Sequence, residues 1–358
     1  MFKKIFFSLL LFLWFSPNAF CQHFISFNNK QISYEGRIAY DPEAAELMWP
    51  GTSVTLNFKG TGISGEFKDQ DTSNYYDVII DNKLKNVIQF DTLKKTVILA
   101  SGLSYGKHSL RLFKRTEWDK GKTWFYGFET NGKTKLLKPK KLPVRKIEFF
   151  GNSISCGYAI NDSAGNSSLG FYENNYDAYP AITARHFNAQ YHCTAKSGIG
   201  IMVSWFPLIM PEMYNRLDPT DSMSKWDFLK FTPDLVVINL FQNDSWIANM
   251  PENEQFKKRF GTTPPGEKQI VNAYKNFVQT IRSTYPKSRI ICMLGNMDIT
   301  KEGSPWPGYV EKAVKEINDP AIFTYFAPYK KTPGHPNVKE QNELAAGLIH
   351  FIDDHIKW

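Results

Sequence analysis

The residue with the clearest capacity for chemistry is Ser153, which follows a glycine turn at the end of an apolar run. Residues 145–150 predict a buried strand, and Gly151-Asn152-Ser153 comes directly after it. In an open parallel sheet, reactive groups collect in the crevice beyond the carboxyl ends of the strands. A serine in that crevice could act as a nucleophile. The alternative is a simple strand-to-loop turn in which asparagine and serine cap the backbone.

Three further short segments lie at the end of an expected strand or at the start of an expected helix. A glycine-rich loop at 195–200 comes directly after the second expected strand, and its backbone N–H groups could face the same crevice. Asn243 lies at the mouth of the third strand, and His335 lies just before the last expected helix. Each segment also has a simpler explanation, as a turn, a helix cap or a helix-entry residue. Their joint occurrence at one edge of one sheet favours a shared site.

The second half of the chain alternates between helical and extended patterns. Helices are predicted at 177–187, 267–283, 309–317 and 338–356, and further strands at 190–195, 234–240, 289–294 and 322–326. Strands that are continuous apolar runs between helices indicate a parallel sheet covered on both faces. We therefore predict a three-layer α/β domain.

The first half of the chain, from Ile25 to about Lys138, shows short alternating segments separated by turns and no long amphipathic pattern. Strands are predicted at 53–58, 75–80, 95–99, 107–113 and 123–128. Regularly spaced short strands of this kind indicate an all-β domain of the β-sandwich or jelly-roll type.

A lysine-rich stretch, Lys133 to Lys146, separates the two patterns and contains Pro139 and Pro143. It is interpreted as a solvated linker in preference to a patch for an anionic ligand. The expected boundaries are 22–138 for the β-sandwich, 139–146 for the linker into the first strand and 147–358 for the α/β domain.

The first 21 residues have the pattern of a secretory signal peptide. Lys3 and Lys4 form a basic start, residues 5–15 an apolar core too short to span a bilayer, and Ala19-Phe20-Cys21 a cleavage site. Cleavage before Gln22 is favoured over lipid anchoring at Cys21, because the bulky ring of Phe20 lies where lipoprotein signals prefer small residues. We expect a secreted or periplasmic protein without stable membrane insertion.

The net charge and the cysteine content do not indicate a nucleic-acid-binding, metal-binding or disulfide-rich protein. Loss of Lys3 and Lys4 lowers the net charge from +8 to +6, an excess that does not require a nucleic-acid partner. The remaining cysteines, Cys156, Cys193 and Cys292, lack the spacing of a metal site or a disulfide framework, although one pair could bridge. We find no histidine constellation for a metal, no nucleotide loop and no cofactor motif.

The order Gly-Asn-Ser-Ile, Ser-Gly-Ile-Gly, Asn-Asp and His-Pro resembles the four blocks of the SGNH (GDSL-type) hydrolase superfamily, over essentially all of the second domain. The whole chain is more specifically similar to the family-two carbohydrate esterases, which join an N-terminal β-sandwich to such a domain. This narrower similarity is carried by Trp49-Pro50-Gly51-Thr52, Tyr75-Tyr76-Asp77-Val78-Ile79-Ile80-Asp81, Leu112-Phe113-Lys114-Arg115-Thr116-Glu117, Glu173-Asn174-Asn175-Tyr176, Ala178-Tyr179 and Ile182-Thr183-Ala184-Arg185.

The resemblance implies that Ser153 is the nucleophile and that His335 is the general base. It also implies an oxyanion hole made of the backbone N–H groups of Ser153 and Gly198 and the side-chain amide of Asn243. Ester hydrolysis needs these groups, because a serine hydroxyl is a poor nucleophile until an imidazole accepts its proton. The tetrahedral intermediate then places negative charge on the former carbonyl oxygen, which the three donors stabilise.

The chain departs from the superfamily pattern at several positions. Asn152 replaces the usual Asp of the first block. Phe241-Gln242 replaces Gly-Thr before Asn243, which leaves open a different backbone path for that loop. Thr332 replaces the aspartate three residues before the histidine, so a Ser–His–Asp triad cannot be carried over. The second imidazole nitrogen needs an orienting partner. The resemblance to the family-two carbohydrate esterases implies that a main-chain carbonyl can take that role, so we hypothesise a Ser153–His335 dyad.

The aromatic residue that the family has just before the His-Pro pair is also missing, because Gly334 lies there. Trp205, Trp246 or Trp306 could supply a sugar-binding platform instead, and core or interface packing is the alternative for each.

We therefore predict a carbohydrate O-acetyl esterase that removes acetyl groups from an acetylated polysaccharide of the xylan or glucomannan type. A lipid or other small-acyl esterase of the same superfamily is the first alternative, since fold does not fix function. A non-catalytic glycan-binding protein is the second, and the departures at Phe241 and Thr332 keep it open.

Overall fold

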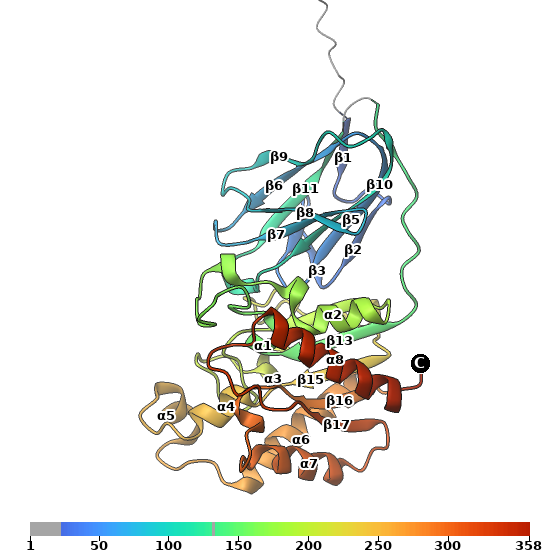
Figure 1. Ribbon diagram of the computed structural model, residues 1–358. Helices are drawn as coiled ribbons and strands as arrows, with labels where there is room; N and C mark the ends of the chain where they lie inside the picture. The colour runs from blue at the N-terminus through green and yellow to red at the C-terminus, as the bar shows by residue number, and fades with distance from the viewer. Residues whose placement is uncertain (1–22, 131–132) are drawn as a thin grey trace, which may run out of the picture.

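Five parallel strands form the sheet of the C-terminal domain in the computed structural model, which describes residues 23–130 and 133–358. The signal peptide predicted at residues 1–21 lies outside the described residues. The strand order is β14-β13-β15-β16-β17, so the first strand of the domain is an inner one (Figure 1). The bounds are β13 (Lys146–Gly151), β14 (Gln190–Ala195), β15 (Leu235–Asn239), β16 (Arg289–Leu294) and β17 (Ile322–Phe326).

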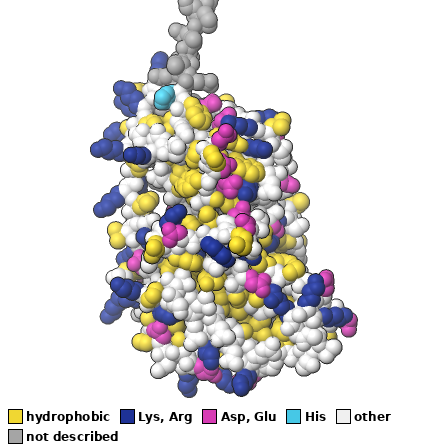
Figure 2. Space-filling model, turned by 180° about the vertical axis from the view of Figure 1, so that it is seen from behind, with side chains coloured by type: hydrophobic (Ala, Val, Ile, Leu, Met, Phe, Trp, Pro, Cys, Tyr) yellow, Lys and Arg dark blue, Asp and Glu magenta, His cyan; other side chains and the backbone are white. Residues whose placement is uncertain are grey.

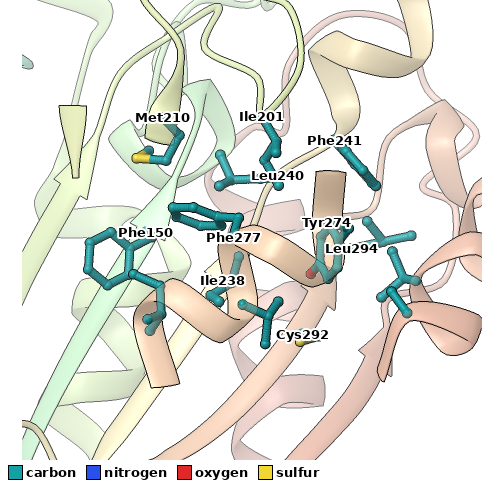
Figure 3. Close-up of a cluster of buried hydrophobic side chains, with 14 of the residues drawn as sticks. Phe150, Ile201, Met210, Ile238, Leu240, Phe241, Tyr274, Phe277, Cys292 and Leu294 are labelled. Carbon is teal, nitrogen blue, oxygen red and sulfur yellow. The ribbon is translucent and has the colours of Figure 1, made fainter. Parts of the chain in front are cut away.

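Helices cover both faces of this sheet. On one face α6 and α7 pack against a cluster that includes Phe150, Ile238 and Phe277 (Figure 3). On the other face α2 and α8 pack around Phe149 and Leu348. The helices are α1 (Ser153–Cys156), α2 (Tyr179–His186), α3 (Met210–Met213), α4 (Gln242–Ile247), α5 (Glu254–Phe260), α6 (Glu267–Thr284), α7 (Trp306–Ile317) and α8 (Val338–His355). Short 3-10 helices are η1 (Trp118–Lys120), η2 (Gly170–Tyr172), η3 (Asn175–Asp177), η4 (Phe228–Lys230) and η5 (Asp298–Thr300). The predicted three-layer α/β arrangement is confirmed.

The N-terminal domain is a sandwich of two antiparallel sheets, as predicted. One sheet has the order β3-β4-β11-β6-β9 with β1 beside β11, and the other has the order β12-β5-β10-β7-β8 with β2 beside β5. The strands are β1 (His23–Ser26), β2 (Ile32–Glu35), β3 (Ile38–Tyr40), β4 (Ala45–Leu47), β5 (Ser53–Gly60), β6 (Ile63–Asp69), β7 (Tyr76–Ile80), β8 (Lys83–Ile88), β9 (Lys95–Ala100), β10 (Gly106–Lys114), β11 (Thr123–Thr130) and β12 (Lys135–Leu136). Alternating inward side chains such as Leu56, Phe67 and Leu112 fill the space between the sheets.

The lysine-rich stretch begins as part of the sandwich and then crosses to the second domain. Its strand β12 pairs with β5, and Leu137 donates its backbone N–H to the carbonyl of Asn57 at 2.9 Å. The following residues run along the side of the molecule into β13 (Figure 1). Side chains of both charge signs are spread over both domains on the face shown in Figure 2.

The two domains pack closely through residues that carry the family resemblance. Gly51 has a φ of +77°, and a Cβ there would collide with the ring of Tyr191 in the second domain. The Trp49 indole donates to the carbonyl of Leu217 at 2.8 Å, and Glu35 of β2 accepts the backbone N–H of Tyr191 at 2.7 Å. The sandwich is therefore an integral neighbour of the α/β sheet.

A buried ion pair crosses the same interface. The guanidinium of Arg37 lies 2.8 Å from a carboxylate oxygen of Glu148 on β13, and the two side chains are 1% and 0% exposed. Arg37 also donates to the carbonyls of Tyr214 and Arg216, at 2.7 and 2.9 Å. Because each charge is paired and hydrogen-bonded, removal of one partner would leave the other buried without compensation.

Of the helices in the described residues, none combines the length and the apolar composition needed to cross a bilayer. Cys156, Cys193 and Cys292 are buried free thiols in the described chain, so the disulfide that the sequence left open is not formed here.

Replacement of Arg37 should destabilise the protein strongly. Arg37→Met keeps an apolar stem but leaves Glu148 unpaired, and we expect the free energy of unfolding to fall by about 3–5 kcal/mol. Arg259→Met is the matched control, because its pair with Glu212 at 3.0 Å is largely exposed and should contribute about 0–1 kcal/mol. Urea unfolding followed by tryptophan fluorescence measures both, and equal losses would contradict the role of the buried pair.

Candidate active site

The site lies where the strand order of the parallel sheet reverses. Strand β13 has β14 on one side and β15 on the other, and Gly151, Ala195 and Asn239 lie side by side at their carboxyl ends. Ser153, Gly198 and Asn243 follow these positions closely along the chain. Three of the predicted site residues therefore share one edge of the sheet. The crevice at such a switch point is open to ligands.

Ser153 begins helix α1 directly after the turn. The side chain of Asn152 accepts the backbone N–H of Ile154 at 3.1 Å and so caps this short helix. A Cβ at Gly151 would collide with the side chain of Ser155, so only glycine fits between the strand and the helix. Asparagine therefore serves as the cap where the superfamily has aspartate.

His335 hydrogen-bonds to the serine across the loops. Its Nε2 lies 3.0 Å from Ser153 Oγ, and its Nδ1 lies 3.0 Å from the main-chain carbonyl oxygen of Gly165. Since a carbonyl can only accept, Nδ1 carries the proton, and Nε2 is left as the acceptor for the serine hydroxyl. This geometry activates a serine as a nucleophile.

The environment keeps the imidazole neutral. Burial lowers the pKa of His335 below its ordinary value, and the hydrogen bond to Gly165 only partly opposes this effect. The ring of Tyr158 covers the imidazole at a centroid distance of 4.7 Å. A neutral imidazole can accept a proton at pH 7, which is the state that a general base requires.

Thr332, at the position of the superfamily aspartate, belongs to a different network. Its hydroxyl hydrogen-bonds to the carboxylate of Glu340 and lies 2.7 Å from the ammonium of Lys330. Glu340 in turn accepts the backbone N–H of Asn337 at 2.9 Å in a capping box that begins α8. The nearby carboxylate therefore fixes the helix that follows the histidine and does not contact the imidazole.

Gly334 also has a structural reason to replace an aromatic residue. It has a φ of +70°, and a Cβ there would lie 2.7 Å from the carbonyl oxygen of Ala164. The close approach of the two segments lets the backbone N–H of His335 donate to Gly165 at 2.9 Å, beside the bond from Nδ1.

Donors for a negatively charged oxygen lie on the neighbouring loops. In residues 23–130 and 133–358, the backbone N–H groups of Ser153 and Gly198 have no protein acceptor. The amide of Asn243 donates one hydrogen to the carbonyl of Ile199 at 2.8 Å, which leaves its second hydrogen free. Its oxygen accepts the indole N–H of Trp205 at 3.1 Å, so the amide is held in one orientation.

Asp244 holds the glycine-rich loop in place. Its carboxylate accepts the backbone N–H groups of Ile201, Met202 and Val203 at 2.6 to 3.1 Å. Burial raises the pKa of Asp244 to about 6, and the hydrogen bonds from these N–H groups oppose that effect. The Asn-Asp block thus supplies one residue to the site and one to its support.

Phe241 occupies a glycine position without changing the backbone path expected of glycine. Its φ is +80°, in the left-handed region that glycine favours. The ring is fully buried and lies beside Tyr274 at a centroid distance of 4.8 Å (Figure 3). It also contacts Trp306 at a centroid distance of 5.0 Å. Core packing therefore stabilises a conformation that is unfavourable for phenylalanine alone.

The three tryptophans differ in their surroundings. Trp205 is 45% exposed beside Asn243, and the indole of Trp246 donates to Asp298 at 2.8 Å. Trp306 is only 6% exposed and packs in the core beside Phe241, which favours the packing alternative over a sugar platform for this residue.

Sequence reasoning missed two supports of the site. The carbonyl of Gly165 carries no sequence signal, because every residue has one. Glu117, in a segment that carries the family resemblance, accepts the backbone N–H of Ser197 at 2.7 Å.

We find no group of three or more metal-ligating side chains in the part of the chain described.

Comparisons with known proteins agree with this architecture. Residues 149–351 match the GDSL-like Lipase/Acylhydrolase family, which is the class that the α/β domain and its serine define. Residues 34–139 match the family Carbohydrate esterase 2 N-terminal. A family two carbohydrate esterase from Clostridium thermocellum, solved in complex with cellohexaose, is 34% identical, with a TM-score of 0.80 over 90% of this chain and 98% of that one. The chain belongs to the family two carbohydrate esterases, and the predicted resemblance is confirmed.

Two curated relatives are named as esterases. Cellulase/esterase CelE of Acetivibrio thermocellus is 33% identical over 92% of this chain, which spans 40% of the length of that relative. An acetylxylan esterase / glucomannan deacetylase of Cellvibrio japonicus is 24% identical over 94% of this chain and 92% of its own length.

The geometry predicts an Nδ1-protonated, neutral His335 at pH 7. Because burial lowers its pKa, half-protonation is expected below about pH 6.5. Imidazole 15N NMR shifts, assigned with His335→Gln, report both the tautomer and the pKa. Thr332→Val is the control and should leave the tautomer unchanged. An Nε2-protonated or doubly protonated ring at pH 7 would contradict the hydrogen-bond pattern.

Proposed function

We propose that the protein is a secreted carbohydrate O-acetyl esterase in which Ser153 and His335 form a catalytic dyad. The observation that carries the proposal is the imidazole of His335, which bridges Ser153 Oγ and the carbonyl of Gly165 at 3.0 Å on each side. This bridge supplies the fixed tautomer that a triad obtains from aspartate.

The reaction follows from the protonation states. As Ser153 Oγ attacks the acetyl carbonyl carbon, its proton passes to Nε2 of His335. The carbonyl oxygen becomes negatively charged and accepts hydrogen bonds from the backbone N–H groups of Ser153 and Gly198 and the free amide hydrogen of Asn243. The imidazolium then gives its proton to the departing sugar oxygen, which leaves an acetyl-serine.

Water completes the cycle through the same groups in reverse roles. His335 takes a proton from water, the hydroxide attacks the acetyl-serine, and the second tetrahedral intermediate collapses to acetate and free Ser153. Turnover needs neutral His335, so it is present above the pKa of that residue and is lost as the pH falls through it. Since burial lowers this pKa, activity extends to mildly acidic pH.

The choice of substrate rests on the relatives and on the surface beside the serine. A relative is named acetylxylan esterase / glucomannan deacetylase, and a structural neighbour was solved with cellohexaose. The exposed ring of Trp205 beside Asn243 offers an apolar face of the kind on which pyranose rings stack. These observations favour an acetylated xylan or glucomannan over a lipid ester.

Kinetics on matched substrates test the proposal. Wild type should release p-nitrophenol from p-nitrophenyl acetate and acetate from acetylated xylan or glucomannan, and Ser153→Ala and His335→Ala should each lose about 10³-fold or more in kcat. Faster turnover of long-chain acyl esters would indicate the lipid-esterase alternative. Folded wild type that binds the glycans without releasing acetate would indicate a binding protein.

Trp205 provides a finer test of the oxyanion hole. Trp205→Phe keeps an aromatic ring but removes the N–H that orients Asn243, and we expect kcat on p-nitrophenyl acetate to fall roughly 5- to 10-fold. KM should change little, because the substrate is too small to need the ring. Trp246→Phe, whose indole bonds to Asp298, is the matched control and should retain wild-type kcat. Equal effects of the two substitutions would contradict this role.

A further inference from the structure

Two fully buried carboxyl groups meet where the sandwich contacts the active-site loops. Glu117 follows strand β10 of the sandwich, and Glu173 follows η2 in the α/β domain. Both side chains are 0% exposed. The two carboxyl groups lie within hydrogen-bonding reach of each other. One oxygen of Glu117 and both oxygens of Glu173 find no donor on any other described residue. A hydrogen bond between two carboxyl groups requires that one of them is protonated.

The other contacts decide which group carries the proton. Oε2 of Glu117 accepts the backbone N–H of Ser197 at 2.7 Å and lies 3.3 Å from the ammonium of Lys196. Burial opposes ionisation of Glu117, but Lys196 and these hydrogen bonds hold its pKa at about 2. Burial and the neighbouring Glu117 raise the pKa of Glu173 well above its ordinary value. Glu117 is thus the carboxylate and Glu173 the acid that donates to it.

The ionised oxygen of Glu117 reaches both halves of the catalytic machinery. Ser197, its donor, immediately precedes Gly198 of the proposed oxyanion hole. Cys156, whose thiol lies 3.8 Å from the same oxygen, ends the helix that begins at Ser153. The backbone N–H of Lys196 also reaches the carbonyl of Gly151 at 3.3 Å. One carboxylate oxygen from the sandwich therefore contacts the oxyanion loop and the nucleophile helix.

We propose that Glu117 and Glu173 form a proton-sharing pair that positions the backbone N–H of Gly198 relative to Ser153. Both are positioning residues, since neither touches the reacting atoms. The inference rests on the proposed hydrolysis at Ser153. It assigns to the sandwich a direct part in the geometry of the reaction, because Glu117 anchors the loop through Ser197, beside Asp119, whose carboxylate lies 2.6 Å from the ammonium of Lys196.

The protonation pattern makes the two glutamates respond differently to the same substitution. In Glu173→Gln the amide still donates to Glu117, so the pair keeps its hydrogen bond and its single negative charge. In Glu117→Gln the negative charge that faces Ser197 is lost, and Lys196 keeps only the carboxylate of Asp119 as an ion-pair partner among the described residues. In Glu173→Met the donor is lost while the volume remains similar. A merely space-filling role would make the two glutamine variants alike.

Steady-state kinetics on p-nitrophenyl acetate test the pair. We expect Glu173→Gln to stay within about twofold of wild type, and Glu117→Gln and Glu173→Met to lose about 10- to 100-fold in kcat with little change in KM. Glu252→Gln is the control, because that carboxylate is 92% exposed and pairs only with Lys257 at the surface. Thermal unfolding midpoints verify that each variant is folded at the assay temperature.

The outcomes separate this inference from the proposed function. Active wild type with equal kcat in Glu117→Gln and Glu173→Gln would overturn the proton-sharing pair and leave the dyad intact. A folded wild type without activity would overturn the proposed hydrolysis at Ser153, and with it the inference that rests on that hydrolysis. If Glu173→Met fails to fold, the comparison of the two isosteric glutamine variants still decides.

Discussion

The active-site geometry depends on one main-chain carbonyl. Gly165 accepts two hydrogen bonds from His335, one from its backbone N–H and one from Nδ1, at 2.9 and 3.0 Å. The loop that presents this carbonyl is itself built around a carboxylate, because Asp162 accepts the backbone N–H groups of Asn166 and Ser167 at 3.0 Å. A neutral acceptor fixes the tautomer without the charge of an aspartate. The imidazole can therefore be buried and still remain unprotonated at pH 7.

Much of the fold could be predicted because its pattern is strong. The strands at 190–195, 289–294 and 322–326 have the predicted bounds, since each is a short extended segment that follows a helix. Helix α7 begins earlier than predicted, at Trp306, because proline at its second position is compatible with a first turn. Strands β1 to β4 and β12 were not predicted, since segments of two to four residues cannot show alternation, and the longer strands β6 and β8 were missed as well.

In the candidate site, residues that belong to a short sequence motif could be predicted from the sequence, whereas a backbone group outside such a motif could not. Ser153, Gly198, Asn243 and His335 lie together at one edge of the sheet, which their places after strands or before a helix predict. The family resemblance also implied a main-chain partner for the imidazole, but it could not name Gly165, which is distant in the chain and contributes no side chain. Whether Trp306 is exposed or buried could not be read from the sequence, because burial of an aromatic residue is decided by tertiary packing.

The charged contacts between the domains have a consequence for how such proteins can diverge. Arg37 and Glu117 come from the sandwich, whereas their partners Glu148 and Lys196 come from the α/β domain. A chimaera that joins the sandwich of one relative to the hydrolase domain of another keeps each pair only where its two parents carry the matching residues. Exchange of one domain alone is therefore expected to be selected against wherever the parents differ at these positions, and substitutions on either side of the interface are expected to covary.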